Sequence, residues 1–132
     1  MAAIPEQYQD LLTPEKKAFA SIATVQPDGS PQVTPVWFDY TGGKVRVNVA
    51  KGRVKVRNMK QGSPVALAII DPDNAYRYVQ IRGKVSHVTE DGARAHIDSL
   101  AHKYIGKDYP WSQPGEVRVL FEIEPAAASG MG

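Results

Sequence analysis

The stretch that decides the fold is Gly43-Lys-Val-Arg-Val-Asn-Val-Ala-Lys-Gly-Arg-Val-Lys-Val-Arg-Asn-Met59. Its first half, Lys44 to Ala50, alternates apolar and polar side chains and therefore predicts a β-strand. The strand breaks at Gly52, and cations then follow at every second position. A strand end that leads into a turn rich in Arg and Lys is a common way to bind phosphate, because guanidinium groups and backbone donors converge on one anion. The stretch thus predicts both a sheet and an anion site.

Positive charge is concentrated around this stretch. No carboxylate lies between Tyr40 and Ile70, whereas the basic residues there are Lys44, Arg46, Lys51, Arg53, Lys55, Arg57 and Lys60. The whole chain has 16 basic and 14 acidic residues, so the remainder of the chain has a net charge of −5. A defined anion site is therefore favoured over a broadly basic surface. The alternative is a solvated surface turn, but the five cations within residues 51–60 would then repel one another.

Length and composition restrict the possible functions. With 132 residues, the chain is expected to form a single domain over 1–132. It has no cysteine, which excludes disulfides, thiolate nucleophiles, iron–sulfur clusters and cysteine-ligated zinc. His87, His96 and His102 lack the spacing of a metal site, so no metal is expected. There is neither a signal-peptide pattern nor a long apolar stretch, which predicts a cytoplasmic protein without membrane contact.

The sequence around the stretch predicts mainly β-structure. Thr13-Pro14-Glu15 is typical of a helix start, and a short helix to about Ala18 is expected. The apolar alternation then predicts strands at 19–25, 32–40, 44–50, 64–70, 76–88 and 116–123. A helical turn is favoured over a strand before Gly62, and a second helix should run from a Thr89 cap to Gly106. Six strands with flanking helices and short turns predict a small antiparallel barrel.

The order of these motifs resembles the pyridoxamine 5'-phosphate oxidase-like split β-barrel superfamily, and within it the coenzyme F420-dependent (deazaflavin) reductases. The similar motifs are the turn and strand from Asp28, the 44–49 strand, Arg53-x-Lys55-x-Arg57-Asn58-Met59 and the strand from Pro64. The resemblance extends from about Leu12 to Glu124. It implies a mainly β fold with flanking helices, a six-stranded antiparallel FMN-binding split barrel. It also implies a homodimer with cofactor sites at the interface.

The resemblance also implies where a cofactor binds. In the family, basic residues after the third strand hold the cofactor phosphate, and the ring lies against the second and third strands. Extra positive charge suits a glutamylated tail, and the start of the 76–88 strand reaches the cofactor of the partner subunit in relatives. The cofactor-binding residues expected on this basis are Pro35, Val36, Trp37, Asn48, Val49, Lys51, Arg53, Lys55, Arg57 and Tyr76.

The residues themselves are compatible with such a ligand. A flavin-like ring has apolar faces and a polar edge, so it needs apolar walls and a few hydrogen bonds, and Pro35-Val36-Trp37-Phe38 supplies a wall. F420 and FMN both carry a phosphate after the ribityl chain, so the phosphate site does not distinguish them. The Arg-x-Lys-x-Arg-Asn pattern is more similar to the deazaflavin branch, which makes F420 the expected cofactor and FMN the alternative.

The predicted function is that of an F420H2-dependent oxidoreductase, which transfers a hydride to a small electron-poor acceptor of the enone, quinone or tetrapyrrole type. An FMN-binding oxidoreductase and a non-catalytic flavin or F420 carrier remain alternatives. Nucleic-acid binding is disfavoured because the rest of the chain is acidic. No catalytic acid or base is identified, although the Tyr109 hydroxyl is a candidate proton donor. The Tyr109-Pro110-Trp111 loop is either a lid over the ring or a plug on the barrel.

Overall fold

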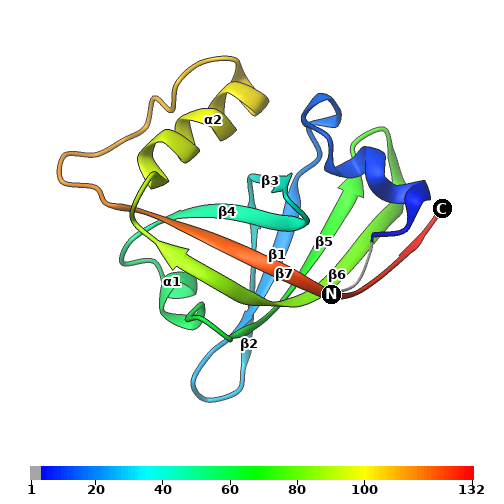
Figure 1. Ribbon diagram of the computed structural model, residues 1–132, viewed down its shortest axis with the longest axis horizontal. Helices are drawn as coiled ribbons and strands as arrows, with labels where there is room; N and C mark the ends of the chain where they lie inside the picture. The colour runs from blue at the N-terminus through cyan, green and yellow to red at the C-terminus, as the bar shows by residue number, and fades with distance from the viewer. Residues whose placement is uncertain (1–3) are drawn as a thin grey trace.

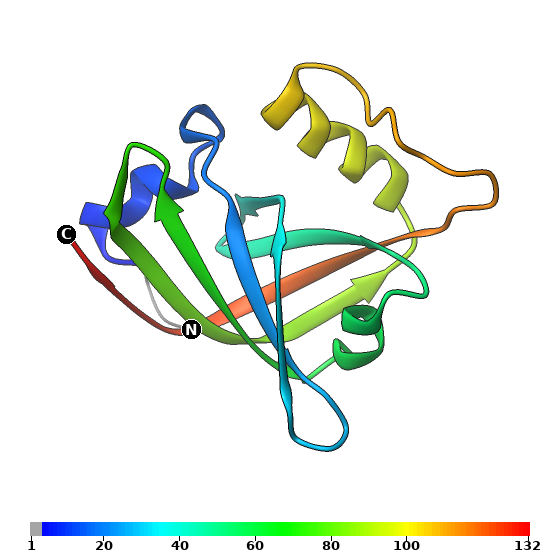
Figure 2. The same cartoon turned by 180° about the vertical axis from the view of Figure 1, so that it is seen from behind.

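The computed structural model describes residues 4–132, and it consists mainly of β-strands (Figure 1). Helices α1 and α2 lie toward one end of the curled sheet and the 3₁₀ helices toward the other (Figures 1 and 2). The elements in chain order are η1 Glu6–Leu12, η2 Pro14–Lys16, β1 Ala20–Val25, β2 Pro31–Val36, β3 Phe38–Thr41, β4 Lys44–Ala50, α1 Val54–Asn58, β5 Pro64–Asp71, β6 Asn74–Thr89, α2 Ala93–Ile105 and β7 Arg118–Met131.

The strands form one antiparallel sheet in the order β2-β1-β5-β6-β7-β4-β3. Its two edge strands, β2 and β3, are consecutive in the chain and are joined by Trp37 alone. The sheet must therefore curl until its edges meet at Trp37, although no ladder pairs β2 with β3 in the part of the chain described. This is an antiparallel split β-barrel with few helices, which confirms the predicted fold class.

The strand count is seven, where the sequence predicted six. The difference arises at Trp37, where the single strand predicted for residues 32–40 divides into β2 and β3. Side chains alternate through this region, with Val36 and Phe38 both buried on either side of Trp37, so nothing local marks the division. The break is instead imposed by closure of the sheet, because β2 pairs with β1 and β3 pairs with β4.

The barrel interior is filled by alternate side chains of the strands. Val45 and Val47 of β4 are fully buried, as are Phe38 of β3 and Phe121 of β7. Each such side chain contributes about 1.5–3 kcal/mol of hydrophobic stabilisation. At one end, η1 covers the core with Leu11. Within residues 4–132, no helix combines the length and the apolar character that crossing a membrane requires.

Several element boundaries differ from the predictions. The helix expected from Thr13 is 3₁₀ and ends at Lys16, because the next residue, Lys17, has a left-handed φ of 54°. Helix α2 begins after Gly92, because the Thr89 hydroxyl accepts the Asp91 N–H within the preceding turn and does not cap the helix. The predicted end of α2 at Gly106 is confirmed. Strand β7 continues to Met131, since its second half pairs with the long strand β6.

Candidate functional site

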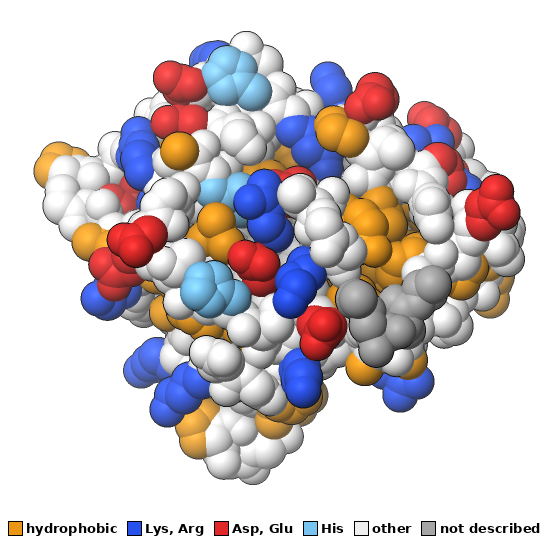
Figure 3. Space-filling model, viewed as in Figure 1, with side chains coloured by type: hydrophobic (Ala, Val, Ile, Leu, Met, Phe, Trp, Pro, Cys, Tyr) orange, Lys and Arg blue, Asp and Glu red, His pale blue; other side chains and the backbone are white. Residues whose placement is uncertain are grey.

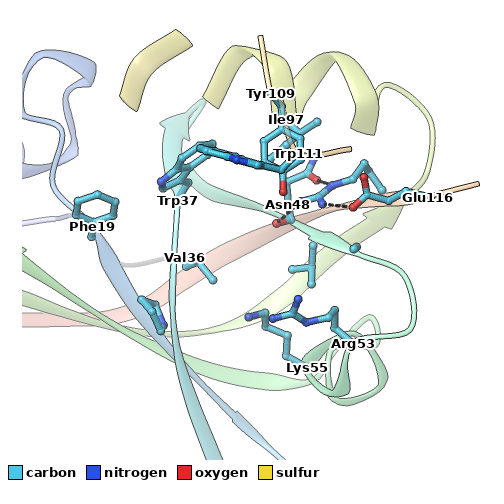
Figure 4. Close-up of a pocket in the computed structure, with 14 residues that line it drawn as sticks. Phe19, Val36, Trp37, Asn48, Arg53, Lys55, Ile97, Tyr109, Trp111 and Glu116 are labelled. Carbon is cyan, nitrogen blue, oxygen red and sulfur yellow. Dashed lines mark hydrogen bonds and ion pairs between the residues drawn. The ribbon is translucent and has the colours of Figure 1, made fainter. Parts of the chain in front are cut away.

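A pocket of about 420 Å³ opens beside Trp37, a size typical of small-molecule sites (Figure 4). Its walls come from β2, β4, the start of α1, α2 and the loop before β7, so it exists only in the folded chain. The residues that line it are Phe19, Pro35, Val36, Trp37, Asn48, Val49, Ala50, Arg53, Lys55, Ile97, Tyr109, Trp111, Glu116 and Arg118.

One end of the pocket is cationic, where Arg53 and Lys55 lie side by side (Figure 4). Lys55 is only 7% exposed, and its Nζ donates to Thr34 Oγ1 at 2.7 Å. Neither Arg53 nor Lys55 forms an ion pair with any carboxylate of residues 4–132. Burial, and then the charge of Arg53, lower the pKa of Lys55. A buried ammonium without a counter-charge is unfavourable, so this end is suited to bind an anion.

The other end of the pocket is aromatic. Tyr109 meets Trp37 edge-on, with ring centroids 6.1 Å apart, and Trp111 is tilted against Trp37 at 6.5 Å. Tyr109 and Trp111 also contact each other, at 5.6 Å. The loop that carries these two residues therefore forms part of the pocket wall. Aromatic rings in this arrangement present apolar surface with fixed geometry, which suits a flat ligand.

Asn48 lines the pocket, but its side-chain amide is occupied by the protein. Its Oδ1 accepts a hydrogen bond from Arg118 Nε at 2.8 Å. Its Nδ2 donates to the Ala93 carbonyl at 2.7 Å and lies 3.1 Å from His96 Nδ1. Both amide hydrogens thus have partners. The side chain of Asn48 joins β4 to α2 and β7 and holds the pocket wall together.

The hydrogen-bond chain continues beneath α2. Because Asn48 donates to His96 Nδ1, the other ring nitrogen, Nε2, carries the proton and donates to Asp39 Oδ2 at 2.8 Å. Arg46 contacts both oxygens of Asp39, at 2.7 and 3.0 Å. Burial raises the pKa of Asp39, but the bonds from His96 and Arg46 outweigh it and hold the pKa at about 2. Helix α2 is thereby fixed to β3 and β4.

Arg118 and Glu116 were not predicted as site residues. Arg118 Nη1 donates to Glu116 Oε1 at 3.0 Å, and its guanidinium lies 5.2 Å from the centroid of the Tyr109 ring. Arg118 therefore connects the aromatic loop to Asn48. The only local signal is an acidic and a basic residue at spacing two around the start of the last strand, which is equally typical of surface charge.

Seven of the ten predicted cofactor-binding residues line the pocket, namely Pro35, Val36, Trp37, Asn48, Val49, Arg53 and Lys55. The other three lie outside it. Lys51 forms an ion pair with Glu90 at 3.0 Å, Arg57 is exposed on α1, and Tyr76 is 84% exposed at the start of β6. Their contribution to binding stays a prediction. No group of three or more His, Asp or Glu side chains in residues 4–132 is arranged to hold a metal ion.

The protein is a split β-barrel whose pocket is cationic at one end and aromatic at the other, an arrangement suited to a flat ligand that carries an anionic group. Residues 4–132 match the pyridoxamine 5'-phosphate oxidase family. The chain belongs to this family, which confirms the resemblance seen in its motifs. No curated protein sequence matches the chain significantly.

Solved structures support the assignment. The chain is 38% identical to an F420 reductase, with a TM-score of 0.82 over 96% of this chain and 98% of the other. A conserved hypothetical protein from Mycobacterium tuberculosis is 19% identical, with a TM-score of 0.73 over 98% of this chain and 85% of the other. An FAD and heme binding protein from Mycobacterium smegmatis is 16% identical, with a TM-score of 0.68 over 98% of this chain and 71% of the other. The last two similarities show the fold alone.

Proposed function

We propose that the protein is an F420H2-dependent oxidoreductase, which transfers a hydride from a reduced deazaflavin in this pocket to a small electron-poor acceptor. The observation that carries the proposal is the buried ammonium of Lys55, which has a hydroxyl but no carboxylate as its partner among residues 4–132. Arg53 adds a second cation at the same end of the pocket (Figure 4). The similarity to an F420 reductase favours a deazaflavin over FMN.

The pocket residues fit such a cofactor. Lys55 and Arg53 are suited to bind the phosphate, because charge-assisted hydrogen bonds from an ammonium and a guanidinium are the strong ones. Val36 and Val49 line the pocket, and Val36 lies between its cationic and aromatic ends (Figure 4). Apolar side chains there suit the faces of a flat ring, and the backbone of β2 and β4 can meet its polar edge.

A bound deazaflavin would supply the hydride, and the protein would contribute position and a proton. Trp37, Tyr109 and Trp111 line the aromatic end of the pocket, where they would contact a bound ring. A reduced acceptor needs a proton, and the hydroxyl of Tyr109 is available to give one. The only hydrogen bond that Tyr109 makes within residues 4–132 is from its backbone N–H to Asp98 Oδ1, at 3.0 Å.

A binding titration with F420 and FMN side by side tests the choice of cofactor. We expect F420 to bind more tightly, and reduced F420 to be oxidised when a quinone or enone is added, as followed by absorbance. Tighter binding of FMN would support the FMN-dependent alternative. Tight binding of F420 without turnover on any acceptor would support a non-catalytic carrier.

The face of the molecule shown in Figure 3 does not favour nucleic-acid binding. The face in Figure 3 has Lys and Arg side chains interspersed with Asp and Glu, so positive charge forms no continuous patch on it. A protein that follows a nucleic-acid backbone needs such a patch.

We also propose that the protein is a homodimer with the cofactor pockets near its interface. Phe19 and Trp111 line the pocket and are 55% and 56% exposed, so the chain alone leaves its aromatic rim open. The exposed Tyr76 would reach a cofactor only from a second copy, because it does not line the pocket of its own chain. Size-exclusion chromatography with light scattering tests the dimer, and a monomer at micromolar concentration would contradict it.

A further inference from the structure

The opening in the barrel is bridged by the last turn of α2. Tyr104 Oη donates a hydrogen bond to the Ala18 carbonyl at 2.6 Å, just before β1. The Phe38 N–H, at the start of β3, lies 3.5 Å from the same oxygen. Strand β1 lies next to edge strand β2, whereas β3 is the opposite edge of the sheet. The hydroxyl of Tyr104 therefore contacts both sides of the split.

Lys103, the residue before Tyr104, also binds the start of β3. Its Nζ donates to the Phe38 carbonyl at 2.7 Å and lies 4.2 Å from the centroid of the Phe38 ring. Since β3 is an edge strand, some of its backbone groups have no strand partner. Lys103 and Tyr104 supply partners for the carbonyl and the N–H of Phe38. The backbone directly after Trp37 is thus held by the helix.

The ring of Trp37 is held by the same turn of α2. Tyr104 is stacked between Trp37 and Phe19, with centroid distances of 5.2 and 5.0 Å and interplanar angles of 14° and 21°. Trp37 and Phe19 line the pocket, but Tyr104 and Lys103 do not. Any effect of these two residues on a ligand must therefore act through the rings that they position.

We propose that Tyr104 and Lys103 are positioning residues, which close the split of the barrel and hold Trp37 as a rigid wall for the ring of the ligand. The role of Trp37 toward a ligand rests on the proposed function, whereas its positioning in the free protein does not. The phosphate end of the pocket comes from α1, so the turn of α2 sets the affinity for the ring and leaves the phosphate contacts unchanged.

Fluorescence of the cofactor-free protein tests the positioning directly. The chain has two tryptophans, so Trp37 is the only one in a Trp111→Phe background. In that background we expect Tyr104→Leu and Lys103→Met to increase the quenching of Trp37 by acrylamide and to weaken its near-UV circular dichroism. Lys103→Arg, which keeps a cationic donor, should restore both signals. Tyr78→Phe serves as a matched control, since Tyr78 lies on β6 outside the pocket lining.

Two ligand pairs separate the ring from the phosphate: F420 with its phosphate-free deazaflavin nucleoside, and FMN with riboflavin. In the native Trp111 background, we expect Tyr104→Leu to lower the affinity for both ligands of whichever pair binds, F420 and its nucleoside or FMN and riboflavin. The expected loss is about 2- to 10-fold, which corresponds to the energy of one contact between two aromatic rings. Lys55→Met should weaken only the phosphate-bearing member. A loss that is confined to the phosphate-bearing member in Tyr104→Leu would overturn the proposal.

The outcomes for the two proposals are distinct. Unchanged quenching of Trp37 in both Tyr104→Leu and Lys103→Met would overturn the positioning role, whatever binds. Increased quenching in a protein that binds neither ligand pair would support the positioning role and contradict the proposed function. If Tyr104→Leu does not fold, Lys103→Met and Lys103→Arg decide, because the rescue by arginine distinguishes a specific donor from general packing.

Discussion

Asp39 and His96 form a hydrogen bond between β3 and α2, with His96 Nε2 lying 2.8 Å from Asp39 Oδ2. The bond is one step in a chain that runs from Arg46 to Arg118 at the pocket wall. Partly buried hydrogen-bond networks of this kind stabilise a fold only when every member has its partner. The two residues therefore connect the stability of the barrel to the geometry of the pocket.

We expect Asp39→Asn to lower the free energy of unfolding by about 1–3 kcal/mol at pH 7, because Arg46 and His96 lose a charged acceptor. The pKa of Asp39 is about 2 in the folded protein, below its ordinary 3.8. The stabilisation is therefore complete above pH 3.8 and is lost as the pH falls through 2. Urea unfolding from pH 7 to 2 checks this, with Asp108→Asn as an exposed control. A difference from wild type that is independent of pH would contradict the prediction.

Lys103 should affect stability in the alkaline range. Burial lowers its pKa from 10.5 to about 8, although Asp39 and Glu15 oppose the shift. Between these two values the unfolded chain binds the proton more tightly, so the contribution of Lys103 to stability rises with pH and is constant below 8. Burial raises the pKa of the adjacent Tyr104, which keeps its hydroxyl protonated in this range. Between pH 7 and 10, the free energy of unfolding of wild type should rise relative to that of Lys103→Met. Curves that stay parallel over this range would contradict the prediction.

Arg118→Lys should loosen the aromatic loop although the charge is retained. A lysine lacks the planar fork that reaches Asn48 and Glu116 together and covers the Tyr109 ring. We expect a loss of about 1–2 kcal/mol in unfolding free energy. In a Trp37→Phe background, acrylamide quenching of Trp111 should also increase. Quenching equal to that of the Arg118 parent would show that the loop is held by other contacts.

The parts of the site that could be predicted from the sequence are those specified by neighbouring residues. The 44–50 strand, the turn at Gly52 and the cations after it follow one another, so the local pattern predicted an anion site here. The family resemblance then assigned Arg53 and Lys55 to that site. Lys51 has the same local signal. Its ion pair with Glu90, 39 positions away, is a tertiary contact that no local pattern predicts.

The remaining parts depend on contacts between distant segments. Arg118 and Asn48 are 70 positions apart, and their hydrogen bond exists because β7 pairs with β4. The division of the sheet at Trp37 likewise results from curvature of the whole sheet, because the alternation of buried side chains continues through it. Tyr104 lies within the predicted second helix, but no local pattern indicates its contacts with Ala18 and Phe38, which span 86 and 66 positions.

Lys55→Met is the most direct test of the anion site. The substitution keeps the aliphatic stem in its buried place but removes the charge and the bond to Thr34. We expect affinity for the phosphate-bearing cofactor to fall by about 1–3 kcal/mol, as is typical of a charge-assisted bond. Because burial without a counter-charge disfavours the ammonium, the free protein should be no less stable than wild type.

Calorimetric titration at two salt concentrations measures this loss and separates it from general electrostatics. Lys60→Met is the matched control, since Lys60 is an exposed cation of the same basic stretch that does not line the pocket. Removal of either charge should reduce long-range attraction slightly, an effect that salt screens. Only Lys55→Met should retain its loss at high salt, because the contact at Lys55 is buried. Equal losses in the two variants would mean that the phosphate is bound elsewhere, and the anion site assigned to Arg53 and Lys55 would be wrong.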